Sequence, residues 1–182
     1  MKKGFSLLIA VILMTGLCAV EVKAQWGIGA SYEIRNESPK TGFGVRVERE
    51  ILSGLPILDL NIRGHFSTFS EENTISSYNV SFSNEFNVYD YGAALVLGAD
   101  LGIVKPYLGA GLGSERFKFS SGSLESDFSE SNFYWNGFGG AEVTLLPFLK
   151  PFIEFRYSKL MDTDDVEFDE ISRLAIGVNF RF

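Results

Sequence analysis

The chain ends with the stretch RLAIGVNFRF, residues Arg173 to Phe182, in which apolar residues alternate with polar or small ones without exception. Successive side chains of a β-strand point to opposite faces, so this stretch predicts a strand with one apolar and one polar face. An aromatic residue at the end of such a strand is typical of a strand that lies against lipid, with its last ring at the bilayer interface. The stretch therefore favours a transmembrane β-barrel. Its apolar positions are Leu174, Ile176, Val178, Phe180 and Phe182.

The same period of two recurs in seven segments before this one. A bulge, or the point where the strand leaves the membrane, is expected near Ser114 to Arg116, because the alternation slips there. Together with the C-terminal segment these segments predict eight strands. The seven lie within 26–35, 42–48, 58–67, 89–101, 106–119, 133–145 and 153–158.

The connections between the predicted strands alternate in length. Short turns are predicted at 53–56, 102–105 and 147–150, and longer polar loops at 36–40, 70–85, 120–132 and 161–172. Short turns at one end and long loops at the other are typical of bacterial outer-membrane barrels, with both termini on the short-turn side. A soluble up-and-down barrel is the alternative, and it would hide its apolar face inside.

The composition of the two predicted faces favours the membrane barrel. A small eight-stranded barrel is just wide enough to be filled by side chains, so charges of both signs would neutralise one another in its lumen, with glycines making room. Aromatic residues gather near both ends of the apolar face, as two interfacial belts would. We therefore predict an all-β fold, an eight-stranded antiparallel up-and-down transmembrane β-barrel. The predicted lumenal charge network is Glu33, Arg35, Arg46, Glu48, Asp59, Arg63, Asp90, Asp100, Glu142, Glu154, Arg156 and Arg181.

The first residues predict export. Lys2 and Lys3 precede a nearly continuous apolar run, and Val22 and Ala24 are small residues of the kind that a signal peptidase reads. We predict a cleaved signal peptide at 1–24 and a single barrel domain at 25–182. The only cysteine, Cys18, would leave with the signal, which argues against a small secreted scaffold held by disulfides.

The charge of the predicted mature chain argues against nucleic acid as a partner. Residues 1–24 hold three of the 16 basic and one of the 23 acidic residues, which leaves 13 and 22 and a net charge of −9. Such a charge repels phosphate backbones.

The C-terminus resembles the insertion signal of outer-membrane proteins, on the residues Gly177, Phe180 and Phe182. Ala175 stands where that signal usually has a polar residue. Over its whole mature length the chain is similar to the small barrels of the OmpA, OmpX and OmpW type and to porin-like outer-membrane proteins. The resemblance implies location in the outer membrane of a Gram-negative bacterium, assembly by the barrel insertion machinery, and contact with outer-membrane lipid and lipopolysaccharide. We expect a monomer.

One pair of residues raises the question of catalysis. The single histidine, His65, stands two residues before Ser67, and a His-x-Ser pair with a nearby carboxylate is how lipid A deacylases build a hydrolase site. The predicted phase turns both residues toward the lumen, so we interpret His65 as sharing a polar network with Asp59 and Arg63. No catalytic residue, cofactor site or metal site is predicted.

The acidic stretch from Asp162 to Glu170 is interpreted as a solvated loop, with divalent-cation binding as the alternative.

Three functions remain from the sequence. The favoured one is a structural or surface-interaction barrel with a filled lumen, because the polar face carries charges that can pair. The alternatives are a narrow porin-like channel for ions or small solutes and, less favoured, a lipid-modifying enzyme.

Overall fold

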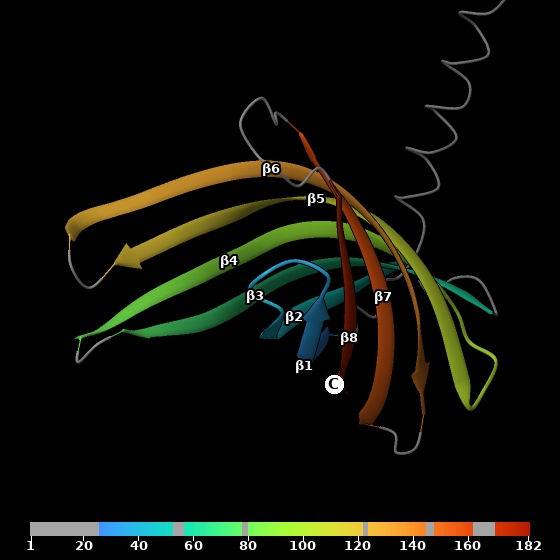
Figure 1. Cartoon of the computed structure of the whole chain (residues 1–182). Helices are drawn as coiled ribbons and strands as arrows, with labels where there is room; N and C mark the ends of the chain where they lie inside the picture. The colour runs from blue at the N-terminus through green and yellow to red at the C-terminus, as the bar shows by residue number, and fades with distance from the viewer. Residues whose placement is uncertain (1–25, 53–56, 78–79, 122–123, 145–147, 162–169) are drawn as a thin grey trace, which may run out of the picture.

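The computed structural model describes residues 26–52, 57–77, 80–121, 124–144, 148–161 and 170–182, and these form an all-β structure of eight strands (Figure 1). The predicted signal peptide and most of the acidic stretch lie outside the described residues. No helix within the described ranges is long and apolar enough to span a membrane. The strands are β1 (Trp26–Arg35), β2 (Thr41–Leu52), β3 (Leu58–Ser77), β4 (Val80–Ala99), β5 (Val104–Ser121), β6 (Leu124–Val143), β7 (Leu149–Met161) and β8 (Glu170–Arg181).

Each strand pairs antiparallel with the next, and β8 pairs with β1 to close the barrel. The closure continues to the end of the chain: the backbone N–H of Trp26 donates to the carbonyl of Phe182 at 3.0 Å, and the reverse bond measures 2.9 Å. A closed barrel leaves no unpaired edge along the seam between β1 and β8. The predicted eight-stranded antiparallel barrel is confirmed.

The barrel places its polar face inside and its apolar face outside. On β1, Glu33 and Arg35 are buried, whereas Ile28 and Ile34 are 49% and 43% exposed. The same alternation runs through β2, where Arg46 and its polar-face neighbours are buried and the residues between them are exposed. A soluble barrel would show the reverse arrangement, so the outward apolar face requires an apolar environment.

Four strands are longer than the alternation predicts. The pairing of β2 with β3 ends at Gly42 and Phe69, and that of β6 with β7 ends at Phe133 and Met161, but β3 to β6 continue to pair with one another. They extend well past the other strands (Figure 1). The predicted loops 70–85 and 120–132 were therefore wrong, because most of their residues are strand. Their many serine, asparagine, aspartate and glutamate residues had indicated loops. We call residues 70–77, 80–87, 118–121 and 124–132 the projecting sheet.

Of the two interpretations of Ser114 to Arg116, a bulge or the point where the strand leaves the membrane, the bulge is wrong. The pairing of β5 with β4 and with β6 runs through these positions without a shift, and Glu115 is buried inside the barrel. The alternation had looked broken because Ser114 faces outward but is small and polar. The register shifts instead between Phe119 and Ser121.

The turn between β4 and β5 lies earlier than the predicted 102–105. β4 ends at Ala99 and β5 begins at Val104. Gly102 adopts a φ of 92°, a left-handed conformation that favours glycine. Its backbone N–H donates to the Asp100 carboxylate at 2.9 Å, which fixes the tight turn.

Candidate functional site

Charged side chains fill the lumen of the barrel. Among the residues that the structure describes, ion pairs within 4.0 Å join six arginines and Lys105 to five glutamates and two aspartates, so these paired groups carry no net charge when His65 is neutral. Burying a charge is costly unless it is paired, and here each paired charge has its counter-charge across the barrel or beside it. The pairs fall into two groups and a separate pair at the turn end, between Lys105 and Asp59 at 2.7 Å.

The first group lies toward the short turns, and we call it the turn-side cluster. Arg63 is its centre: its Nε donates to Glu48 at 2.7 Å and its Nη1 donates to Glu154. Arg46 donates to the same Glu154 carboxylate at 3.2 Å, so two guanidinium groups share one carboxylate from the opposite wall. Such shared, charge-assisted bonds lock several strands together across the lumen. The cluster comprises Arg46, Glu48, Arg63, Glu142, Glu154, Arg156 and Arg181.

The second group lies toward the loops, and we call it the loop-side cluster. It comprises Glu33, Arg35, Asp90, Glu115 and Arg173. Arg173 donates to both Asp90 and Glu33, the latter at 3.2 Å. Arg35 pairs with Glu115 and also donates to the backbone carbonyls of residues 37 and 38, each at 3.0 Å. Arg35 thereby ties the loop after β1 to the wall of the lumen.

Aromatic rings fill the space between the charged groups. The guanidinium carbons of Arg35 and Arg173 lie 4.9 and 4.7 Å from the centre of the Phe69 ring, and that of Arg63 lies 4.8 Å from the Phe138 ring. In the turn-side cluster, Arg46 stacks on Phe152 at 3.3 Å. A cation over a ring face is attracted by the ring quadrupole, and the ring excludes water from the ion pairs. The two clusters are therefore packed cores as well as charge networks.

The structure places eleven of the twelve predicted network residues in the lumen, and Asp100 outside it. Asp100 had been assigned to the lumen because it continues the alternation of β4. The strand stops one residue earlier, so Asp100 lies exposed in the turn and accepts a hydrogen bond from Gly102.

Three members of the network were missed from the sequence. Lys105 had been placed in a turn, and Glu115 lies where the alternation had been interpreted as slipping. Arg173 falls on the polar face of the C-terminal stretch, and that position is the signal that identifies it. The inward aromatic residues were missed as well, although Phe69 and Phe152 continue the polar alternation of their strands.

His65 and Ser67 both face the lumen, and they do not form a nucleophile–base pair. The His65 Nε2 atom lies 3.0 Å from the Tyr134 hydroxyl, whereas the Ser67 hydroxyl donates to Glu33 at 3.1 Å. The expected sharing of His65 with Asp59 and Arg63 was wrong, because side chains two positions apart on a strand are about 7 Å apart and their partners come from across the lumen. Tyr134 donates in turn to Asp90, which links His65 to the loop-side cluster.

The outward face carries aromatic residues near both ends of the barrel. Trp26, Phe180 and Phe182 lie exposed at the turn end. At the loop end, neighbouring strands bring rings together in pairs, with centroids 5.5 to 6.4 Å apart. This arrangement places two belts at two interfaces. The loop-end pairs are Tyr32 with Phe43, Phe66 with Tyr89, and Trp135 with Tyr157.

The residues of the predicted insertion signal lie on both faces of β8. Phe180 and Phe182 point outward and are 50% and 72% exposed, while Gly177 occupies an inward position beside the Phe152 ring. Among the described residues no group of three or more His, Cys, Asp or Glu side chains is arranged to hold a metal ion. The acidic stretch falls outside the described residues except for Glu170, which begins β8.

A closed eight-stranded barrel with a polar, side-chain-filled lumen and an apolar outer face with two aromatic belts defines a transmembrane β-barrel protein. Residues 6–182 match the family of the outer membrane protein beta-barrel domain, and the chain belongs to this family. The predicted resemblance to small outer-membrane barrels is thereby confirmed. None of the curated protein sequences matches this chain significantly.

Solved structures of outer-membrane proteins share the fold. The attachment invasion locus protein Ail of Yersinia pestis superimposes with a TM-score of 0.60 at 22% identity, over 88% of this chain and 100% of that one. Neisserial surface protein A gives 0.62 at 21% identity, over 87% and 97%. A major outer membrane protein of Thermus thermophilus gives 0.64 at 14% identity, over 88% and 100%. At these identities the likeness concerns the fold alone.

Proposed function

We propose that the protein is a non-conducting outer-membrane barrel that displays its projecting sheet and loops for interaction at the cell surface. The observation that carries this proposal is the charge-balanced, aromatic-packed lumen. It supports a plugged barrel over the porin-like alternative, and it supports a role in the parts of the chain outside the membrane.

The lumenal contacts explain why conduction is disfavoured. An ion crossing the barrel would have to separate buried guanidinium and carboxylate groups, such as Arg63 from Glu48 and Arg173 from Asp90. Removing one partner from a buried pair costs several kcal/mol, on the order of 3–5 kcal/mol. A cavity lined by turn-side residues has a volume of about 10 Å³, which holds no more than about one water molecule.

The projecting sheet supplies the surface for interaction. Short turns face the periplasm in barrels of this class, so the ends of β3 to β6 face the outside of the cell. The projecting sheet contains six acidic residues and one basic residue, Lys118. For soluble partners at the cell surface, this charge favours cationic or neutral molecules over polyanions such as the heparin analogue bound to Ail in its crystal structure.

The proposal also covers how the protein is exported and assembled. The signal peptide at 1–24 would direct the chain to the periplasm of a Gram-negative bacterium. The outward rings of Phe180 and Phe182, together with Gly177, would present the terminal strand to the insertion machinery. The inserted barrel would be a monomer and would carry no catalytic residue.

Planar-bilayer recording tests the closed lumen. Inserted, heat-modifiable wild-type protein should give no discrete current steps, whereas the double variant Arg63→Ser with Glu154→Ser, which removes the centre of the turn-side cluster, should give steps under the same conditions. Reproducible wild-type steps of the same size as those of the variant would overturn the non-conducting barrel and favour the channel.

Cysteine labelling in intact cells tests the orientation. Cys18 is the only native cysteine and lies in the predicted signal peptide, so introduced cysteines are the only thiols of the mature chain. A membrane-impermeant maleimide should label Ser70→Cys on the projecting sheet of intact cells. It should label Asp100→Cys, in the turn between β4 and β5, only after the outer membrane is permeabilised. The opposite pattern would place the projecting sheet in the periplasm.

A further inference from the structure

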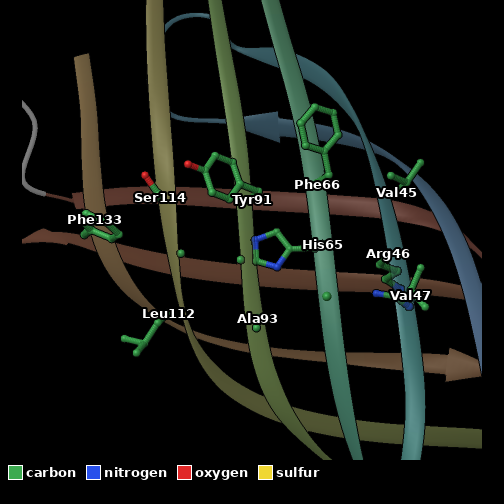
Figure 2. Close-up of a pocket in the computed structure, with 13 residues that line it drawn as sticks. Val45, Arg46, Val47, His65, Phe66, Tyr91, Ala93, Leu112, Ser114 and Phe133 are labelled. Atoms are coloured by element: carbon green, nitrogen blue, oxygen red, sulfur yellow. The ribbon is translucent and has the colours of Figure 1, made fainter. Parts of the chain in front are cut away.

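A hollow of about 660 Å³ opens on the outward face of the barrel, over β2 to β6 (Figure 2). Its centre is formed by two neighbouring small residues, Gly64 on β3 and Ala93 on β4, which are directly paired in the sheet. A Cβ atom built on Gly64 meets nothing within 4 Å. The hollow exists because Gly64 has no side chain and Ala93 has only a methyl group.

Apolar and aromatic side chains frame this hollow. Phe66, Tyr91 and Phe133 stand on the side toward the loops, and they are 42%, 49% and 69% exposed. Val47 and Leu112 lie in the same row as Gly64 and Ala93, one strand further out on each side (Figure 2). Within the bilayer such a wall is in contact with hydrocarbon, so the ligand chemistry that fits it is an acyl chain.

The hollow lies in the half of the apolar band nearest the loops. On β3, Gly64 is one outward position below Phe66, and on β4, Ala93 is one outward position below Tyr91, both at the aromatic belt. Since the loops face outside, this half of the band belongs to the outer leaflet.

Two basic residues stand beyond the aromatic rim on the same strand as Leu112. Arg116 and Lys118 are exposed on the outward face of β5, four and six residues from Leu112, which corresponds to about 14 and 20 Å along the strand. The Lys118 Nζ atom lies 5.4 Å from the centre of the Tyr89 ring. Cationic groups just beyond the aromatic belt are placed to meet anionic headgroups.

We propose that this face is a binding site for one molecule of lipid A, the phosphorylated and multiply acylated anchor of lipopolysaccharide. One acyl chain occupies the hollow at Gly64 and Ala93, and the phosphates lie against Arg116 and Lys118. Lipid A is the occupant that combines an outer-leaflet position, several acyl chains and anionic phosphates, and these match the depth, the shape and the charge of the site. The inference rests on the orientation proposed above and does not depend on whether the lumen conducts.

Native mass spectrometry of the purified full-length protein tests the site. The protein is exchanged into detergent containing equimolar lipid A and phosphatidylethanolamine, and the fraction carrying each lipid is measured. Wild-type protein should retain lipid A in preference to phosphatidylethanolamine. Equal retention of the two lipids, or a lipid-free dimer as the main species, would overturn the proposal.

Matched variants separate the hollow from the rest of the barrel surface. Gly64→Leu fills the hollow, whereas Gly137→Leu adds the same side chain at an outward glycine on β6 where a Cβ atom also meets nothing within 4 Å. Lipid A retention should fall about tenfold for Gly64→Leu and stay at the wild-type level for Gly137→Leu. An equal effect of the two substitutions would overturn the assignment of the hollow.

A second pair of variants tests the phosphate contacts. Arg116→Ala and Lys118→Ala should each lower lipid A retention about fivefold, whereas Lys159→Ala, at an exposed lysine on β7, should leave it unchanged. The heat-dependent gel shift reports folding for every variant, so loss of the barrel is distinguished from loss of the lipid. Folded Arg116→Ala and Lys118→Ala proteins that both retain lipid A fully would contradict the proposal, and the cysteine labelling would show separately whether the orientation had failed.

Discussion

On β3, Ile62 and Arg63 are adjacent in sequence but lie in opposite environments: Ile62 is 46% exposed on the outer face, and Arg63 is 1% exposed in the lumen. Arg63 bonds to carboxylates on β2 and β7, so its place is fixed by the positions of particular partners. Ile62 is paired in register with Leu95 on β4, and its side chain requires only an apolar environment. The comparison shows that the inner face of this barrel depends on the identity of each residue, while the outer face depends mainly on hydrophobicity.

The largest effect is expected from a substitution that leaves buried carboxylates without their partner. Arg63→Ala should lower the free energy of unfolding by about 3–5 kcal/mol, because Glu48 and Glu154 each lose a buried charge-assisted bond. Urea titration of the protein in lipid vesicles, followed by tryptophan fluorescence, measures this value.

Arg49→Ala is the control on the outer face. Its guanidinium lies 5.3 Å from the Trp26 ring, and losing that contact should cost about 1 kcal/mol or less. Equal costs would remove the distinction between the two faces.

A charge placed on the outer face should have the next largest effect. Leu95 is 54% exposed near the middle of the outward apolar residues of β4. Leu95→Arg should therefore lower the free energy of unfolding in vesicles by about 2–4 kcal/mol, because the guanidinium would be placed in hydrocarbon. Leu95→Met keeps the apolar character and should cost less than about 1.5 kcal/mol. If Arg is tolerated as well as Met, the outward face of β4 is not in contact with lipid.

The smallest effect on the free energy of unfolding is expected from adding a side chain at a glycine, and it should be larger at an inward glycine than at an outward one. A Cβ atom on Gly111 would lie 2.3 Å from the Ala93 carbonyl oxygen and 2.8 Å from the Ala94 Cα atom, both backbone atoms, so Gly111→Val should cost about 1–3 kcal/mol. Gly64→Val, which enters open space on the outer face, should change the free energy of unfolding by no more than about 0.5 kcal/mol. The same urea titration compares the two. A larger loss for Gly64→Val would show that the outward hollow needs its glycine for folding.

The period of two predicted which residues of most strands face the lumen, because a strand turns successive side chains to opposite faces. It failed where the backbone leaves the barrel or where the pattern is uninformative. Asp100 continues the alternation of β4 but follows its last residue. The projecting sheet is rich in serine, asparagine, aspartate and glutamate, which are residue types typical of loops, so its sequence was interpreted as loop.

The sequence by itself determined the class of the protein, namely the number of strands, their antiparallel order, and an apolar outer face around a polar lumen. These properties follow from local alternation and connection lengths, which are readable without any knowledge of distant contacts. Tertiary structure alone decided which charges meet, such as Arg35 with Glu115, 80 residues apart. It also decided that Phe69 and Phe138 fill the lumen as stacking partners of arginines, and that Gly64 and Ala93 meet in an outward hollow. Closure of the barrel sets these contacts, because it fixes the register of each strand against its neighbours and thereby which side chains share one level of the lumen.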